Sequence, residues 1–289
     1  MQKAQPKKLL RKPQKQNRPG READLKPLPV YDYPGKAGSN KLKNKIAFIS
    51  GGDSGIGRAV AILFAKEGAD VAIAYLSEHA DAETTKDVIE NTYGQKCLLL
   101  PGDLSKEATC KKLMARCLKE YGSLDVLVNN AATHFESKTL GEISTEQLLK
   151  TFSTNLFSIF WLTKAALPAM KEGASIINTA SVTAYRGSGS LIDYASTKGA
   201  IISFTRSLSA NLVEKRIRVN AVAPGPIWTP LIAATFDAKK VAKHGSDVPM
   251  KRAGEPAEVA PSYLFLACED GAYFTGQVLH PNGGEIVNG

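Results

Sequence analysis

Short apolar segments alternate with longer segments of helical periodicity from Lys45 to the end of the chain. The apolar segments are expected to form strands at 45–50, 71–76, 96–103, 124–130, 174–181, 217–225 and 276–280. The segments between them predict helices over 55–67, 80–93, 105–121, 145–170, 191–214 and 256–268. Strands that are apolar throughout and joined by helices form parallel sheets covered on both faces. The pattern therefore predicts an α/β fold, with a doubly wound parallel sheet of about seven strands in one domain over residues 45–289.

The segment over 145–170 carries more apolar residues than one buried helix face requires. Its apolar positions run nearly all round the helix, at Leu156, Phe157, Ile159, Phe160, Trp161 and Leu162. The additional face predicts burial against a second subunit, and a deeper core within the domain is the alternative.

The positive charge of the chain lies almost entirely in its first 45 residues. These carry 13 Lys and Arg against 3 Asp and Glu, whereas residues 46–289 carry 24 against 25. We expect residues 1–44, rich in Pro and Gln, to form an extension without a core of its own. The charge suits nucleic acid or an acidic membrane, and a transit peptide is a weaker alternative. We favour a solvated arm whose Pro-rich part lies along the body or along a neighbouring subunit.

Other compositional features exclude several classes of protein. No apolar run approaches the roughly 20 residues that cross a bilayer. The basic N-terminus is not followed by the apolar core of a signal peptide. The four cysteines are scattered without metal-ligand spacing, and no metal site is expected. These observations favour a soluble protein with free thiols in a reducing, cytoplasmic compartment.

A glycine-rich turn joins the first predicted strand to the first predicted helix. Gly51, Gly55 and Gly57 lie at this junction in the stretch SGGDSGIGRAV. Glycine permits the tight turn and lets a pyrophosphate approach the backbone amides at the helix N-terminus. Strand, turn and helix in this order predict the binding of a dinucleotide.

Three residues that could handle a proton follow one another near the fifth predicted strand. Ser181 ends that strand, and Tyr194 and Lys198 point the same way from one predicted helix because they are four residues apart. An ammonium beside a phenol favours the ionised phenol, so we expect the pKa of Tyr194 to fall from about 10 towards neutrality. Such a phenol passes a proton to or from a substrate oxygen, which the Ser181 hydroxyl could hold.

Further motifs lie in a fixed order over about residues 44–286. Besides Ser181, Tyr194 and Lys198, they are SGGDSGIG, GDLS, NNAA, STNLF, PGPIWT, RAGEPAEVA and TGQVLHPNGG. Together they resemble the short-chain dehydrogenase/reductase family, which has a Rossmann fold. Ser50 stands where the family usually has threonine, and Ala132 where it usually has glycine.

The resemblance implies a role for each matching residue. Tyr194 would pass the proton, Lys198 would lower its pKa and bind the ribose, and Ser181 would hold the carbonyl oxygen. Asn155 would hold a water that connects Lys198 to solvent. The cofactor would contact Gly51, Asp53, Ser54, Gly55, Ile56, Gly57, Tyr75, Asp103, Leu104, Asn130, Ala131, Ala132, Tyr194, Lys198, Pro224, Gly225, Ile227 and Thr229. Its nicotinamide would transfer a hydride to or from the substrate carbon.

The choice of nicotinamide cofactor depends on the residues that end the second predicted strand. An acidic residue there would bind the ribose hydroxyls and disfavour a 2′-phosphate. Tyr75 occupies this position, and no arginine follows to bind a phosphate. NADP(H) is favoured, partly because the basic extension resembles a subgroup of NADP-dependent aldehyde reductases. Glu78 follows Tyr75 by three residues, and because it is acidic NAD(H) stays the alternative.

The resemblance predicts an oxidoreductase that acts on an aldehyde, ketone or sugar-like substrate. It also predicts a homotetramer with the N-terminal arm on a neighbouring subunit. An aldehyde reductase is favoured over a dehydrogenase similar to those of glucose or ribitol. A dinucleotide-sensing module with a nucleic-acid-binding tail is the second class of function, and membrane binding is not expected.

Substrate specificity is expected in the loops beyond the strand ends, over 133–144, 182–192 and 228–250. His134 could face the substrate or lie exposed on a loop, and Tyr185 could line the pocket or pack in the core. His244 lies where the family has a mobile lid, with a solvated position as its alternative. Asp193, beside Tyr194, is expected on the helix surface.

Overall fold

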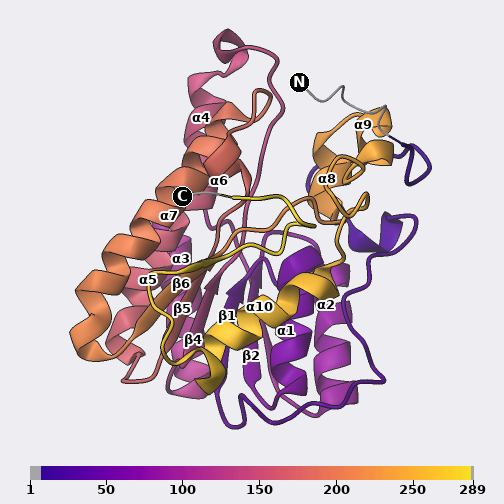
Figure 1. Ribbon diagram of the computed structural model, residues 1–289. Helices are drawn as coiled ribbons and strands as arrows, with labels where there is room; N and C mark the ends of the chain where they lie inside the picture. Colours follow the sequence, from indigo (N-terminus) through magenta and orange to yellow (C-terminus); the bar gives the residue numbers. More distant parts are fainter. Residues whose placement is uncertain (1–7, 288–289) are drawn as a thin grey trace.

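Seven parallel strands form one sheet in the computed structural model, which describes residues 8–287. The strands are β1 (Ile46–Ser50), β2 (Asp70–Tyr75), β3 (Cys97–Pro101), β4 (Val126–Asn129), β5 (Ser175–Thr179), β6 (Arg218–Val222) and β7 (Val278–Leu279). Their order across the sheet is β3-β2-β1-β4-β5-β6-β7 (Figure 1). Each overlaps one of the apolar segments predicted to be a strand. The predicted doubly wound α/β fold is confirmed.

Helices cover both faces of this sheet (Figure 1). On one face lie α1 (Gly55–Lys66), α2 (His79–Asp87) and α10 (Pro256–Ala267), and on the other α3 (Glu107–Tyr121), α5 (Ser158–Ala166) and α7 (Ile192–Leu212). Each layer has its own apolar cluster against the sheet. Shorter elements complete the chain: α6 (Thr183–Arg186), α8 (Pro230–Thr235), α9 (Ala238–Lys243), and the 3₁₀ turns η1 (Glu22–Asp24), η3 (Leu140–Glu142), η6 (Val213–Lys215) and η7 (Glu269–Gly271).

The long helix predicted over 145–170 is divided in the structure. It consists of α4 (Thr145–Phe152), the π turn η4 (Ser153–Phe157), α5 and the 3₁₀ turn η5 (Leu167–Ala169). A second π turn, η2 (Val88–Thr92), follows α2. Periodicity alone does not reveal a π turn, because it adds one residue to a single turn without ending the helix.

The apolar residues of this helix divide between the core and the surface. Leu156, Ile159 and Leu162 are buried, whereas Phe157 is 37% and Phe160 50% exposed. The two aromatic side chains therefore leave part of the apolar face uncovered on the single chain.

The chain reverses direction across the sheet at β1. This strand pairs with β2 on one side and with β4 on the other. The connections after β1 and β4 therefore leave the sheet in opposite directions, which opens a crevice at the carboxyl ends of the strands.

The N-terminal arm, residues 8–44, lies along the body of its own chain (Figure 1). The amide of Leu10 donates to Ala242 O at 2.7 Å, and the indole of Trp228 donates to Pro27 O at 2.9 Å. Leu25 is 1% exposed and packs in a cluster of body residues around Trp228. The body was one of the two places that the sequence left open for the arm, and the arm is better packed there than a solvated segment would be.

A buried ion network joins the arm to the glycine turn. Glu22 and Arg58 have side chains only 1% and 3% exposed, and Arg58 Nη1 lies 2.6 Å from Glu22 Oε1. The other carboxylate oxygen of Glu22 accepts a hydrogen bond from Gly55 N at 2.5 Å, at the N-terminus of α1. Arg58 also contacts Asp81 of α2 at 3.4 Å and donates to Asp53 O at 2.9 Å. Burial raises the pKa of Glu22, against the opposing effect of Arg58.

We expect Glu22→Ala to lower the free energy of unfolding by about 3 kcal/mol or more, because it leaves the buried Arg58 guanidinium short of a counter-charge. Glu172→Ala is the matched control. It removes the carboxylate of a surface pair with Arg216 whose side chains are 65% and 74% exposed. Such a pair contributes at most about 1 kcal/mol. Urea unfolding measures both, and equal losses would contradict the role given to Glu22.

Candidate functional site

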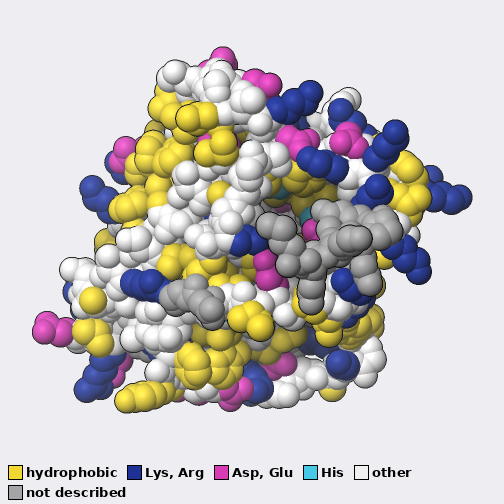
Figure 2. Space-filling view, turned by 45° about the horizontal axis from the view of Figure 1, so that its top comes forward, with side chains coloured by type: hydrophobic (Ala, Val, Ile, Leu, Met, Phe, Trp, Pro, Cys, Tyr) yellow, Lys and Arg dark blue, Asp and Glu magenta, His cyan; other side chains and the backbone are white. Residues whose placement is uncertain are grey.

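A cavity of about 490 Å³ opens at the carboxyl ends of β1, β4, β5 and β6. A second cavity of about 460 Å³ adjoins it and shares the side chains of His134, Ser181 and Tyr194. Figure 2 brings this end of the molecule forward and shows a histidine side chain in a hollow, with Lys and Arg side chains gathered beside it.

The glycine turn between β1 and α1 forms one wall of the first cavity. Gly51 and Gly55 have φ angles of +67° and +53°, which side chains other than glycine rarely adopt. A Cβ on Gly57 would lie 1.8 Å from Gly51 O, so only glycine lets α1 approach the turn this closely. The turn thus presents the N-terminus of α1 to the cavity.

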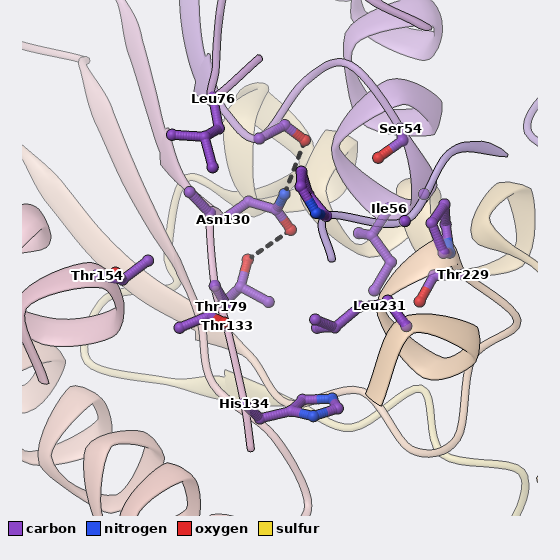
Figure 3. A pocket seen from close by; sticks show the side chains of 18 of the residues that line it. Ser54, Ile56, Leu76, Asn130, Thr133, His134, Thr154, Thr179, Thr229 and Leu231 are labelled. Atoms are coloured by element: carbon purple, nitrogen blue, oxygen red, sulfur yellow. Dashed lines mark hydrogen bonds between the residues drawn. The ribbon is translucent and has the colours of Figure 1, made fainter. Parts of the chain in front are cut away.

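Asn130 links this turn to β5. Its Nδ2 donates to Ser50 O at 3.1 Å and to Gly51 O at 3.2 Å, and Thr179 Oγ1 donates to its Oδ1 at 3.3 Å (Figure 3). The Ser50 hydroxyl accepts from the amides of Asn130 and Ala131. Both contacts use only the hydroxyl oxygen, so serine at position 50 in place of threonine preserves them.

Ser181, Tyr194 and Lys198 converge on the cavity as the sequence predicted. Lys198 Nζ donates to Thr179 O at 2.7 Å and lies 5.4 Å from the centre of the Tyr194 ring. Burial raises the pKa of Tyr194 to about 12, although a hydrogen bond with Ser181 lowers it. Burial also lowers the pKa of Lys198 to about 7.

The predicted fall in the pKa of Tyr194 is therefore wrong for this structure. The spacing of four residues brings the phenol and the ammonium together, but it says nothing about their burial. Lys198 is 1% exposed, and Tyr194 is half-buried in the cavity wall, and burial disfavours the charged form of each. Tyr194 is thus a protonated phenol near neutral pH.

Asn155 lies beneath the cavity and not in its wall. The π turn η4 points its side chain inward, where it is fully buried. Oδ1 accepts from Thr133 N and Nδ2 donates to Thr133 O, both at 2.8 Å. Nδ2 also donates to Thr197 Oγ1 at 3.3 Å. Asn155 therefore holds the segment after β4 in place, and the water expected of it stays a prediction.

Most of the residues predicted to contact a cofactor line the first cavity. They are Gly51, Asp53, Ser54, Gly55, Ile56, Tyr75, Asp103, Leu104, Asn130, Ala131, Ala132, Tyr194, Lys198, Pro224, Gly225, Ile227 and Thr229. Gly57 lies behind the turn, where it supports the turn's shape and does not line the cavity. Whether each contacts a cofactor stays a prediction.

The far end of this cavity, beyond β2 and β3, is polar. The Tyr75 hydroxyl lies 2.9 Å from His79 Nδ1. Burial would raise the pKa of Asp103, but hydrogen bonds from Ser105 and the ammonium of Lys150 lower it. Burial, and then the charge of Glu78, raises the pKa of Asp53 to about 7.

His134 is buried in the wall that both cavities share, so the exposed loop position considered for it is wrong. It is 3% exposed, and its ring lies edge-on to that of Tyr194 with centroids 5.0 Å apart. Tyr185 packs against His280 and a hydrophobic cluster, which is the core alternative. His244 lines the second cavity and is half-buried.

Sequence reasoning missed two contributions to the site. Arg18, Pro19 and Gly20 of the arm line the first cavity, and Arg18 Nη2 donates to His134 O at 3.0 Å. Asp193 is 2% exposed and not on the helix surface, since it accepts from Thr151 Oγ1 at 2.7 Å and so ties α7 to α4. No local pattern could reveal either, because the partners are far apart in the sequence.

Three further observations concern residues 8–287. No three His, Cys, Asp or Glu side chains among them are placed to hold a metal ion. The four cysteines are buried and unpaired. No helix in this part of the chain is both long and apolar enough to span a membrane.

Comparison with known proteins agrees with this geometry. Residues 51–285 match the family model described as enoyl-(acyl carrier protein) reductase. The chain is 58% identical to the uncharacterized oxidoreductase YhxC of Bacillus subtilis, over 99% of this chain and 100% of that one. It is 52% identical to NADPH-dependent aldehyde reductase 1, chloroplastic, of Arabidopsis thaliana (95% and 98%). Its identity to the glucose and ribitol dehydrogenase of Daucus carota is 47% (96% and 97%).

A solved structure shows the same architecture. It is a short-chain dehydrogenase from Burkholderia cenocepacia in complex with NADP, with a TM-score of 0.80 and 28% identity. The match covers 84% of this chain and 98% of that one.

The burial of His134 predicts a specific loss of stability in acid. Burial, together with the charges of Arg18, His244 and Lys198, lowers its pKa from 6.5 to about 3. Between pH 6.5 and about pH 3 this histidine is protonated in the unfolded chain but neutral in the folded chain, so the free energy of unfolding falls as the pH falls. We expect this group to cost about 2 kcal/mol at about pH 5 relative to neutral pH. Urea unfolding at both pH values should show a smaller acid loss for His134→Leu than for the wild type. Equal losses would mean that His134 titrates normally.

Proposed function

Because the chain belongs to the short-chain dehydrogenase/reductase family and is an oxidoreductase, we propose that it reduces aldehydes with NADP(H). The observation that carries the proposal is the convergence of Ser181, Tyr194 and Lys198 at a cavity whose other wall is a glycine turn. A hydroxyl, a phenol and an ammonium at one point suit the transfer of a proton to a carbonyl oxygen.

The cavity wall fits a dinucleotide. Gly51 and Gly55 form a cradle, and a Cβ on Gly55 would lie 3.0 Å from the Thr229 side chain. The first turn of a helix leaves amides without partners inside the helix, and these amides suit a pyrophosphate. Glu22 occupies one of them, Gly55 N, so we assign the pyrophosphate to the following amide, that of Ile56, which also lines the cavity.

The chain's own residues would handle the oxygen and its proton. When bound, the nicotinamide supplies the hydride in the direction of reduction. Tyr194 is protonated near neutral pH and donates its phenolic proton to the carbonyl oxygen. The Ser181 hydroxyl holds the same oxygen and stabilises the charge that develops on it. Lys198 is anchored on Thr179 O, and because its pKa is lowered to about 7 it can gain and lose a proton near neutral pH and so replace the one that leaves Tyr194.

Three observations support NADP(H) over NAD(H). The Arabidopsis relative is named as NADPH-dependent, and the Burkholderia structure is a complex with NADP. Within the site, the raised pKa of Asp53 reduces the negative charge that a 2′-phosphate would meet. NAD(H) remains the alternative because Glu78 also lines the cavity.

A sugar or polyol dehydrogenase is the second candidate function. It is supported by the relative named glucose and ribitol dehydrogenase, which matches this chain along nearly its whole length. The two candidates share the catalytic groups and differ only in what the second cavity accepts.

We further propose a homotetramer located in the cytoplasm. The exposed Phe157 and Phe160 support association, since a second subunit would cover them. The arm could also reach a neighbouring subunit from its place on the body. Arg11 and Arg18 of the arm already stack on Trp228 and Phe135, which supports a structural role for the arm over binding of nucleic acid.

We expect Tyr194→Phe to lower kcat for aldehyde reduction by about a hundredfold or more, because it removes the transferable proton. Folding and NADPH binding should persist, since the ring and its contacts remain. Tyr185→Phe is the matched control, because Tyr185 lines neither cavity. Steady-state rates and NADPH fluorescence measure the two properties. Near-normal turnover in Tyr194→Phe would refute the proposed mechanism.

We expect NADPH to bind about tenfold more tightly than NADH, the difference that one charge-assisted hydrogen bond to the 2′-phosphate contributes. Fluorescence titration of the purified protein with each reduced cofactor gives both dissociation constants. Tighter binding of NADH would reverse the assignment of the cofactor.

A further inference from the structure

The second cavity lies on the substrate side of Tyr194. It shares Ser181, Tyr194 and His134 with the first cavity, but not the glycine turn. Its remaining wall mixes hydrogen-bonding side chains, such as Ser188, Ser190 and Lys240, with apolar ones, such as Leu191, Ile227, Ile232 and Phe236. A substrate that reaches Tyr194 therefore meets both polar and apolar groups.

His134 is the polar side chain of this wall that lies against the catalytic tyrosine. Its ring is nearly perpendicular to that of Tyr194, at an interplanar angle of 78°. The centroids of the His134 and Phe236 rings are 5.5 Å apart. In Figure 3 the imidazole extends from the chain after Thr133 into the lower part of the cavity, away from Ser54. His134 therefore lies beside the tyrosine that would donate the proton.

The backbone of His134 is held from both sides. Arg18 and Thr235 donate to its carbonyl oxygen at 3.0 Å and 3.3 Å. Asn155 binds both backbone groups of the preceding residue, Thr133. These contacts fix the backbone, and packing against Tyr194 and Phe236 holds the ring before a substrate arrives.

Nδ1 of His134 is enclosed and has no hydrogen-bond partner among the described residues, while the side chain lines both cavities. A buried polar group without a partner costs free energy. A ligand hydroxyl that reaches this imidazole can form a hydrogen bond with it, whereas an alkyl chain cannot.

We propose that His134 is a specificity-determining residue that binds a hydroxyl group next to the reacting carbonyl, so that the enzyme selects hydroxyaldehydes and sugar-like substrates over alkyl aldehydes. The inference rests on the proposed function, since it names the substrate class of the same site. A site that offers a hydrogen bond to a substrate hydroxyl discriminates against the analogue that lacks it.

The test compares D-glyceraldehyde with propanal, which have the same carbon chain and differ in two hydroxyls. The measured quantity is the ratio of their kcat/KM values with NADPH, each referred to the free aldehyde in solution. We expect the wild type to favour glyceraldehyde and His134→Leu to lower the ratio about tenfold. His134→Gln keeps a hydrogen-bonding group and should restore the ratio to within about threefold of the wild type.

His280→Leu is the matched control. His280 packs edge-on against Tyr185 at 4.9 Å, much as His134 packs against Tyr194, but it lines neither cavity. The ratio should not change in this variant. A decrease as large as that of His134→Leu would overturn the proposal, because it would assign the effect to the loss of any packed histidine.

The remaining outcomes separate this inference from the proposed function. An unchanged ratio in folded His134→Leu overturns the inference and leaves the function standing. A wild type that prefers propanal overturns it as well, and this measurement does not depend on whether a variant folds. Turnover of neither aldehyde, or full turnover by Tyr194→Phe, would instead reject the proposed function.

Discussion

The buried contact between Glu22 and Arg58 is the constraint on which the site depends. An arginine that is 3% exposed requires a counter-charge, and Glu22 of the arm supplies one at 2.6 Å. The same carboxylate binds the first amide of α1, where a negative charge also meets the favourable end of the helix dipole. Two separate requirements, for a paired charge and for a satisfied helix N-terminus, are met by one side chain. The arm is thereby part of the nucleotide end of the fold.

Anchoring the arm at Glu22 has a consequence a few residues earlier in the chain. Arg18, Pro19 and Gly20 then lie in the wall of the cavity, and Arg18 reaches the carbonyl of His134. Asn155 holds the adjacent Thr133 from the opposite side. The segment after β4 is thus clamped between the arm and the π turn of the long helix. This clamp connects an extension outside the sheet to the groups around Tyr194.

Burial dominates over pairing in the electrostatics of the site. Tyr194 and Lys198 are neighbours, yet each is shifted towards its neutral form because both are enclosed. His134 shows the same effect, and nearby cations add to it. A neutral phenol suits the donation of a proton to a carbonyl, and a neutral imidazole suits hydrogen bonding to a hydroxyl. Both neutral groups fit the proposed reduction of a hydroxyaldehyde.

The sequence by itself determined what depends on local order. Apolar runs predicted all seven strands, the glycine spacing predicted the turn, and the interval of four residues placed Tyr194 and Lys198 on one side of a helix. These features follow from backbone periodicity and from the φ angles that glycine allows. They were sufficient for the fold and for the position of the proposed catalytic groups.

Only the tertiary structure decided the burial of those groups and the contacts between distant segments. The pKa of Tyr194 moved opposite to the prediction because enclosure, which no spacing reveals, outweighs a neighbouring ammonium. The arm, Asp193 and His134 took their places through partners far along the chain, as in the contact between Arg18 and His134, 116 residues apart. Periodicity describes one element at a time, whereas burial and long-range pairing exist only once the elements have packed together.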